Sequence, residues 1–273
     1  MKFRYACATG AVLLAALTAC APAQPRSEAS GPSLAPVSDT VPVSPSAAVA
    51  APSTSPSAAP TTVVDSATTG SGSTAVAACQ AGPHQREVEA ALNKLRIWGT
   101  LTVDGKNTAA DCAAIKKFQK RYGISPVNGR AGDTTFSVAT RLAATDVSQC
   151  QAGTGLVACV DLTHQTTYIM NGGQLVWGPT VTRTGKPGYA TPAGWFKVFD
   201  RSPKHWSNPY KVWLPYWQQF YNGDGFHETT TYIHDMSIGS HGCANLLHTD
   251  AVKYYSLLKA GTKVHLYGRR PGT

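Results

Sequence analysis

A long stretch without core-forming residues most limits what this chain can fold into. Residues 21–78 hold no aromatic side chain and consist mostly of Ala, Pro, Ser, Thr and Val; the charged residues among them are only Arg26, Glu28, Asp39 and Asp65. Such a stretch cannot bury enough apolar area to offset the entropy that ordering would cost. We therefore expect residues 20–78 to be a disordered Ala/Pro/Ser/Thr-rich tether, and one or two folded domains to follow it.

The segment before the tether has the pattern of a secretion signal. Lys2 and Arg4 precede an apolar run from Ala11 to Leu17, and small residues follow. That run is too short to span a bilayer as a helix. We expect residues 1–19 to be a signal peptide and the mature protein to be exported.

The end of this segment, Leu17-Thr18-Ala19-Cys20, resembles a bacterial lipobox. The resemblance implies a lipoprotein signal peptide whose cleavage leaves Cys20 as a lipid-modified N-terminus. Acyl chains on Cys20 would anchor the protein to the outer face of the cell membrane, where it would act in the cell wall. The alternative is a plain signal, cleaved after Ala21 or Ala23, which would release a soluble protein.

The chain is basic. It has 24 Lys and Arg against 15 Asp and Glu, a formal charge of +9 that falls to +7 once Lys2 and Arg4 leave with the signal. This charge suits polyanionic surroundings such as a cell wall. Nucleic acid would suit it too, but export and the lack of a basic run with interleaved aromatics argue against a nucleic-acid partner.

The cysteines divide the chain further. Two of the seven lie in the export segment, and the other five are Cys79, Cys112, Cys150, Cys159 and Cys243. Disulfides persist outside the cytoplasm. Cys79 and Cys112 share one segment, so we pair them. Cys150 and Cys159 flank the next boundary and we pair them too, although sequence alone does not fix the connectivity. Cys243 is then the odd thiol, either buried and inert or reactive.

Residues 79–146 have helical periodicity. Apolar residues recur at helical spacing in two groups, Val88, Leu92 and Leu95, then Ile115, Phe118 and Tyr122. Thr108 to Asp111 has the pattern of a helix start, and a third helix is expected from Asp133 or Thr134. Three short helices form a marginal core, which a disulfide would stabilise. We expect a small three-helix N-terminal domain.

Residues 155–267 are rich in strand patterns. Apolar residues alternate from Leu156 to Leu162, and Asn171-Gly172 is typical of a hairpin turn. Thr249-Asp250 has the pattern of a helix N-cap, and a last strand is expected at Val264 to Tyr267. These patterns predict a mainly β domain with one helix near its end.

The sequence Ser240-His241-Gly242-Cys243 holds the residue types that acyl transfer needs. A thiol with its ordinary pKa of about 8.5 is mostly protonated at neutral pH, and a neighbouring imidazole can take the proton and stabilise the thiolate. Backbone N–H groups at a glycine-containing turn can then face the oxyanion, and those of Gly242 and Cys243 are the candidates. We expect Cys243 to be an anionic nucleophile at ambient pH.

With Asn245, and with His227 sixteen residues before Cys243, this motif resembles the L,D-transpeptidase catalytic domain, the YkuD family. The resemblance covers residues 155–267, and its supporting segments are Thr191–Gly194, Leu214–Tyr216 and Gly225–His227. It implies a β-sandwich-like fold with Cys243 in a groove and one helix after the Cys motif. It implies neither a metal nor a cofactor.

The resemblance also implies a reaction. A tetrapeptide stem of peptidoglycan would acylate Cys243, release its terminal D-Ala and be transferred to an amine of a neighbouring stem. The product would be a 3→3 cross-link, and the enzyme would be a carbapenem target. His227 would act as general base and later as general acid.

Five further residues receive roles from the same resemblance. The backbone carbonyl of Glu228 would hold the imidazole of His227, although many members have Gly or Ser at that position. Ser240, His241 and Gly242 would lie beside or just behind the oxyanion site. Asn245 would be a structural hydrogen-bond anchor.

The helical segment has a resemblance of its own. Val103–Gly105, Ala114–Gln119 and Gly132–Thr135 are similar to the peptidoglycan-binding-like domain, over residues 84–144. Asn128-Gly129 stands where the pattern has a second Asp-Gly. The family implies a three-helix bundle that docks on glycan or stem peptide, and the alternative is a spacer without a ligand.

Three other functions stay open. His227, His234 and His241 fall seven apart with Cys243 nearby, so a zinc hydrolase is conceivable. A wall-binding lipoprotein could keep the fold without catalysis. An L,D-carboxypeptidase would result if water, not an amine, attacked the acyl-enzyme. We expect a monomer whose partners are peptidoglycan and, through its lipid anchor, the membrane.

Overall fold

The structure, a computed structural model, describes residues 79–273. The predicted signal peptide, the lipid-anchor residue Cys20 and the tether come before residue 79 and so lie outside the described residues. Within the described part, no helix is both long enough and apolar enough to cross a membrane.

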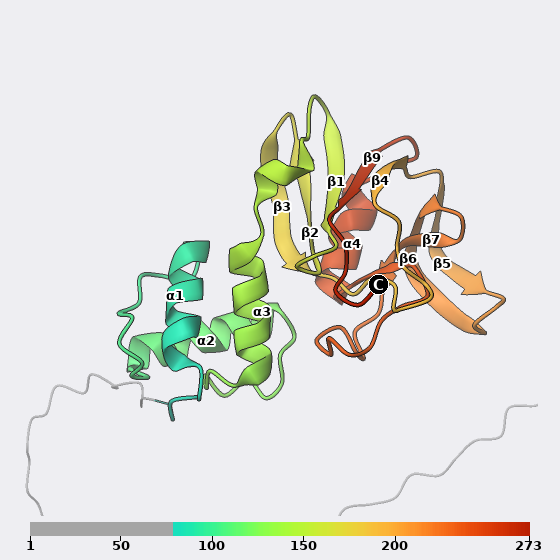
Figure 1. Cartoon of the computed structure of the whole chain (residues 1–273). Coiled ribbons are helices and arrows are strands. Elements are labelled where there is room, and N and C mark those ends of the chain that lie inside the picture. The colour runs from blue at the N-terminus through green and yellow to red at the C-terminus, as the bar shows by residue number, and fades with distance from the viewer. Residues whose placement is uncertain (1–78) are drawn as a thin grey trace, which may run out of the picture. The chain divides into compact units, whose positions relative to one another are not determined.

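Three α-helices come first, namely α1 (Gln85–Leu95), α2 (Ala109–Arg121) and α3 (Asp133–Ala144) (Figure 1). Helix α2 starts where its sequence indicates, because Thr108 and Asp111 form a capping box. The apolar residues at helical spacing lie together in one core, which includes Val88, Leu92, Ile115, Phe118 and Leu142. The periodicity of the sequence therefore turns one face of each helix inward.

Both expected disulfides are present. Cys79–Cys112 joins the residues before α1 to helix α2, and Cys150–Cys159 joins the 3₁₀ helix η1 (Val147–Cys150) to the first strand. Cys243 is the only free cysteine among residues 79–273. The odd thiol of the sequence is thus a free thiol in the structure.

Five strands form the first sheet, in the order β3-β2-β1-β9-β4 (Figure 1). They are β1 (Leu156–Asp161), β2 (Thr166–Asn171), β3 (Gln174–Val181), β4 (Gly194–Lys197) and β9 (Lys263–Tyr267). Strands β2 and β3 form the hairpin that Asn171-Gly172 predicts. Strand β9 pairs in parallel with β1 and antiparallel with β4, so β4 is an edge strand.

Four strands form the second sheet, in the order β5-β6-β7-β8. They are β5 (Asp200–Ser207), β6 (Val212–Tyr221), β7 (Asp224–Glu228) and β8 (Ala244–Leu246). Strands β5, β6 and β7 pair antiparallel, whereas β7 and β8 pair in parallel. The parallel pair brings the two halves of the cysteine–histidine motif to the same edge of this sheet.

One hydrophobic core joins both sheets to helix α4 (His248–Leu257) (Figure 1). It contains Ala158 and Leu266 of the first sheet, Phe226 of the second sheet and Tyr254 of α4, all fully buried. The predicted mainly β domain with one helix after the cysteine motif is confirmed. The core fixes β7 and β8, and these strands in turn position the motif.

Helix α4 does not begin as the sequence predicts. Thr249-Asp250 has the pattern of an N-cap, but α4 starts at His248 and no side chain caps it. Asp250 is fully buried instead, and its carboxylate accepts hydrogen bonds from Arg121 at 2.7 Å, Trp177 at 2.9 Å and Thr180 at 2.6 Å. These donors come from α2 and β3, so the carboxylate joins three elements in place of capping one.

Candidate active site

Cys243 lies directly before β8, whose register with β7 sets His227 beside Asn245 and Phe226 beside Ala244. Side chains alternate along a strand, and paired residues face the same side of a sheet. Asn245 and His227 therefore lie on one face of the β7–β8 pair, and Cys243 lies two residues before Asn245, just outside β8. The parallel pairing thus brings Cys243 and His227, which are sixteen positions apart in the chain, to neighbouring segments.

The imidazole of His227 is held from one side. Its Nδ1 lies 2.9 Å from the carbonyl oxygen of Glu228 and 3.1 Å from the hydroxyl of Thr229, which itself donates to the same carbonyl at 2.7 Å. Because that hydroxyl proton is used on the carbonyl, Nδ1 carries a proton and donates to Glu228. Nε2 is then the unprotonated nitrogen. The sequence indicated the Glu228 contact but not the part of Thr229, whose only signal was a hydroxyl two positions after the histidine.

Burial sets the charge of this histidine. The side chain is 5% exposed, and burial lowers the pKa of His227 to about 4, against a smaller opposite effect of the Glu228 backbone contact. A charged imidazolium would lose its hydration there, and the attraction of Glu228 offsets only part of that loss. His227 is therefore neutral at ambient pH.

The thiol of Cys243 is not anionic in this environment, contrary to our expectation. Burial raises the pKa of Cys243 to about 12, and the nearby carboxylate of Asp224 raises it further, while the Gly225 backbone N–H acts in the opposite direction. In the described residues the sulfur has one hydrogen bond, at 3.9 Å to the carbonyl of Gly223. The resting pair is therefore a neutral thiol and a neutral imidazole, since burial disfavours the charged form of both.

Cys243 lines a pocket of about 410 Å³. Residues of β5, β6, the β5–β6 connection, the β6–β7 turn, the start of β7 and the Cys motif form its wall, among them Trp206, Tyr210, Trp217, Asp224 and His241. Cys243 as a residue is half-buried, so it keeps some exposure at the pocket that it lines. A carbonyl carbon in this pocket could reach it.

The turn before Cys243 is tight, and it uses one of the expected oxyanion donors. The Ser240 hydroxyl accepts the Gly242 N–H at 3.1 Å and donates to the Cys243 carbonyl at 2.7 Å. The Gly242 N–H is therefore occupied, which corrects our expectation, and the Cys243 N–H is the remaining candidate. Gly242 has a φ of +126°, and a Cβ on it would meet the Asp224 carboxylate. Only glycine fits here.

Thr191 holds the same turn from outside. Its hydroxyl donates to the Gly242 carbonyl at 2.6 Å and accepts the Gly185 N–H at 2.9 Å. The sequence marked Thr191 only as part of a motif and gave it no role. Its hydroxyl fixes the orientation of the peptide that leads into Cys243.

The family model of the L,D-transpeptidase catalytic domain (YkuD) matches residues 156–266. The crystal structure of an L,D-transpeptidase (Yku) from Stackebrandtia nassauensis is 51% identical, with a TM-score of 0.70, over 73% of this chain and 98% of that chain. This chain belongs to the L,D-transpeptidase family. The aligned share exceeds what residues 156–266 account for, so the likeness extends beyond the catalytic domain.

Other L,D-transpeptidase structures are more distant. One from Mycobacterium smegmatis is 21% identical over 42% of this chain and 60% of that chain, with a TM-score of 0.38. LdtMt1, solved in complex with imipenem, is 19% identical over 41% of this chain and 59% of that chain, also with a TM-score of 0.38. No match was found among curated proteins.

Two other motif residues of this L,D-transpeptidase family member hold its loops. Asn245 is fully buried, and its Nδ2 donates to the Tyr232 hydroxyl at 2.7 Å, which ties the β7–β8 connection to the sheet. The ring of His241 stacks on Tyr210 at 4.4 Å and meets Tyr189 edge-on at 4.6 Å. His241 thus belongs to the aromatic wall of the pocket.

The remaining histidines do not gather at Cys243. His234 lies 2.8 Å from the Tyr122 carbonyl, and His248 lies 2.8 Å from the Glu228 carboxylate. Among the described residues, no group of three or more His, Cys, Asp or Glu is arranged to hold a metal ion. The three histidines spaced seven apart do not form such a group in the described part of the chain. The Glu228 side chain faces His248, which explains how a charged residue fits where many members have Gly or Ser.

Proposed function

We propose that this protein is a cysteine-dependent L,D-transpeptidase that forms 3→3 cross-links in peptidoglycan through an acyl-enzyme on Cys243. One observation carries the proposal. A free, half-buried cysteine lines a pocket and directly precedes strand β8, which pairs with the strand of a buried imidazole whose Nδ1 is fixed by the Glu228 carbonyl.

The first half of the reaction acylates the enzyme. Sγ of Cys243 attacks the carbonyl carbon of a tetrapeptide stem, a C–S bond forms, and the thiol proton passes to Nε2 of His227. The resting site favours neither a thiolate on Cys243 nor an imidazolium on His227, so the proton is transferred during the attack. The C–N bond to the terminal D-Ala then breaks, and His227 returns the proton to the leaving amine. The Cys243 N–H faces the transient oxyanion.

The second half transfers the acyl group. An amine of a neighbouring stem attacks the thioester carbon, a C–N bond forms and the C–S bond breaks. The amine proton passes through His227 to Sγ, which restores the thiol. The hydrogen bonds of Ser240 and Thr191 keep the turn unchanged through both halves, because neither bond involves a reacting atom.

A second candidate is L,D-carboxypeptidase activity. Cys243 is half-buried in a pocket that opens to solvent, so water can reach the thioester as an amine can. Attack by water would release a trimmed stem and restore the same thiol. The two activities share every residue of the acylation step and differ only in the acceptor.

The proposal includes a location and a role for the helices. Lipidated Cys20 would anchor the protein to the outer face of the membrane, and the tether would let the folded part reach the wall. Helices α1–α3 would dock on peptidoglycan as a peptidoglycan-binding-like domain. A groove of about 300 Å³ beside Asn128, Gly132 and Thr134 supports this docking, since the motif of that family lies there.

The test is to incubate the purified protein with tetrapeptide muropeptides and to separate the products by mass. We expect 3→3 dimers together with free D-Ala, in the presence of EDTA, and no product from Cys243→Ala. Trimmed monomers without dimers would replace the transpeptidase proposal by the carboxypeptidase. If the thiol of Cys243 is free and no product forms, both enzymatic proposals would be contradicted, and a non-catalytic wall-binding protein would remain.

A further inference from the structure

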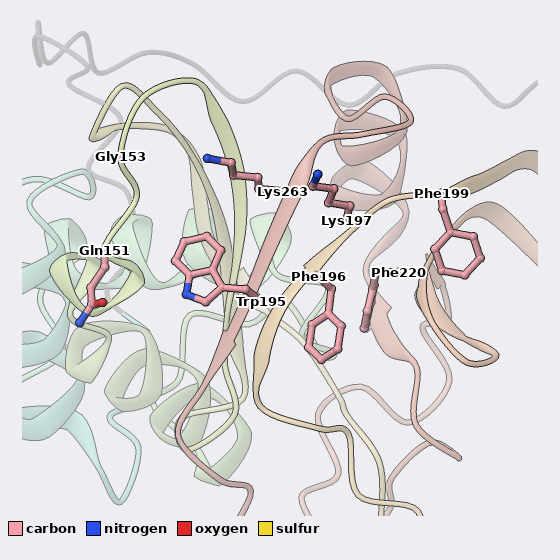
Figure 2. Close-up of a pocket in the computed structure, with 8 residues that line it drawn as sticks. All are labelled: Gln151, Gly153, Trp195, Phe196, Lys197, Phe199, Phe220 and Lys263. Atoms are coloured by element: carbon pink, nitrogen blue, oxygen red, sulfur yellow. The ribbon is translucent and has the colours of Figure 1, made fainter. Parts of the chain in front are cut away.

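A pocket of about 780 Å³ lies away from Cys243 and is nearly twice as large as the pocket that holds it. Figure 2 shows the side chains around it: Gln151, Gly153, Trp195, Phe196, Lys197, Phe199, Phe220 and Lys263. Cys243, His227 and Asp224 are not among them. The proposed reaction gives this pocket no role, so its composition calls for a separate explanation.

An aromatic platform forms one part of the pocket. Trp195 of edge strand β4 stands opposite His265 of β9, and their rings stack 4.1 Å apart at an angle of 4°. His265 covers one face of the indole, yet Trp195 remains 50% exposed, so its other face is open. Phe199 nearby is 59% exposed. Large exposed aromatics clustered at a pocket mark a binding surface. A flat open ring is also what the C–H face of a sugar packs against.

Two positive charges lie beside this platform. Lys197 of β4 and Lys263 of β9 are directly opposite each other in the register, and both are exposed. Figure 2 shows the two lysines as neighbours beside Trp195. Like charges directly opposite each other destabilise a strand pair. In the described part of the chain neither lysine has a salt bridge, and no residue that lines the pocket is acidic.

The two features share one face of the sheet. Trp195 and Lys197 are two residues apart on β4, so their side chains point the same way, about 7 Å apart along the strand. A matching ligand has a sugar ring and, about one ring away, an anionic group. A sugar chain without anions would leave the lysines unpaired, and a polyphosphate without sugar rings would leave Trp195 unused. Peptidoglycan has both parts, because its glycan chain carries stem peptides with free carboxylates.

We propose that this pocket is a second substrate site, which binds a glycan strand of peptidoglycan through Trp195 and the stem carboxylates through Lys197 and Lys263. This proposal rests on the proposed function, since it assumes peptidoglycan as the substrate. The site lies on the same β domain as Cys243. It would therefore hold the polymer while the sulfur reacts with a stem elsewhere on it.

The test measures binding without catalysis. The full mature chain carrying Cys243→Ala is titrated with soluble glycan oligomers that retain their stem peptides, and the indole N–H resonance of Trp195 is followed by NMR. We expect this resonance to shift. Trp195→Ala should weaken binding about fivefold, which is the typical contribution of one aromatic contact to affinity. Lys197→Gln/Lys263→Gln should weaken it about tenfold and reduce its salt dependence.

Controls separate the site from general charge and from misfolding. Lys259→Gln/Arg269→Gln removes two exposed charges of the same domain outside the pocket and should leave affinity within about twofold, as for a distant surface charge. Trp195→Phe should keep most of the binding, which a folding defect would not allow. When Cys243 is retained instead of being replaced by Ala, each pocket variant should still form a carbapenem adduct. This adduct tests the proposed function independently of the second site.

Each alternative outcome has a meaning. An unmoved Trp195 resonance, or equal losses in the pocket and control variants, would overturn the proposal. An equal shift with teichoic acid would replace it by a general polyanion site. Binding with no carbapenem adduct would leave this site standing and contradict the proposed function instead.

Discussion

The two residues that we propose to react are kept neutral by burial. Cys243 and His227 both sit where a charge would lose its hydration, and Asp224 beside the sulfur adds repulsion against a thiolate. The motif in the sequence predicted roles for both residues, but it could not give their charge. That charge depends on β6, β7 and the pocket wall, which come together only in the fold. A neutral pair makes the proposed chemistry depend on a proton transfer during attack.

The pH dependence of the reaction follows from the lowered pKa of His227. The base must be unprotonated, so activity is lost as the pH falls through the pKa in the folded protein. We expect the acid limb of kcat/KM to have its midpoint near pH 4, where burial puts the pKa, and not near 6.5. A pH–rate profile for acylation by a carbapenem measures this midpoint. A midpoint at 6 or above would mean that the imidazole is not buried as described.

Asp224→Asn should make the thiol more acidic. Burial remains the larger cause of the raised pKa of Cys243, but the variant removes the repulsion from the Asp224 carboxylate. Burial raises the pKa of Asp224 itself to about 6, so the repulsion is present only above that pH. The pH profile of alkylation by iodoacetamide should therefore shift to lower pH in Asp224→Asn. An unchanged profile would show that the carboxylate does not reach the sulfur.

The elements show which parts of a fold a sequence can predict. Alternating apolar residues predicted β1, Asn171-Gly172 predicted the β2–β3 hairpin, and helical spacing predicted α1 and α2, because those signals are local. The same local reading made Asp250 an N-cap, and it was wrong. The partners of Asp250 are 70 to 129 residues away in the chain. The Ser240 contact that occupies the Gly242 N–H was equally invisible, since it depends on the shape of a turn.

Asp250→Asn tests the connection between α2, β3 and α4. The variant keeps the shape of the side chain but leaves the guanidinium of Arg121 without its anion. It also replaces the carboxylate that accepts hydrogen bonds from Trp177 and Thr180. Breaking a buried pair in this way typically costs about 3 kcal/mol. Chemical denaturation should show this loss, whereas Asp235→Asn, at an exposed aspartate that bonds Ser237, should change stability much less. Equal effects of the two variants would contradict the role of Asp250.

At the scale of the whole molecule, the described residues belong to one compact unit. The core of α1–α3 also contains Val181, Ile233 and Leu247 of the β domain, so the two parts share apolar packing. The Arg121–Asp250 pair adds a buried polar contact between them. We therefore expect the helices and the β domain to unfold together, in one transition.

The two disulfides should contribute unequally to that transition. Cys79–Cys112 closes a separation of 33 residues and Cys150–Cys159 one of 9. The chain-entropy relation gives losses of roughly 3.7 and 2.6 kcal/mol when each is removed. Paired Cys→Ser variants compared by denaturation should rank in this order. The reverse order would mean that the native contacts around the short loop outweigh the loop entropy.

The central claim is tested most directly by the mass of the intact protein during turnover. The protein is mixed with a tetrapeptide donor, quenched in acid and digested to locate the adduct. We predict a mass increase equal to the donor less its terminal D-Ala, carried by the Cys243 peptide and absent from Cys243→Ala. An unmodified Cys243 in folded protein that releases D-Ala, or an adduct on another residue, would contradict the account.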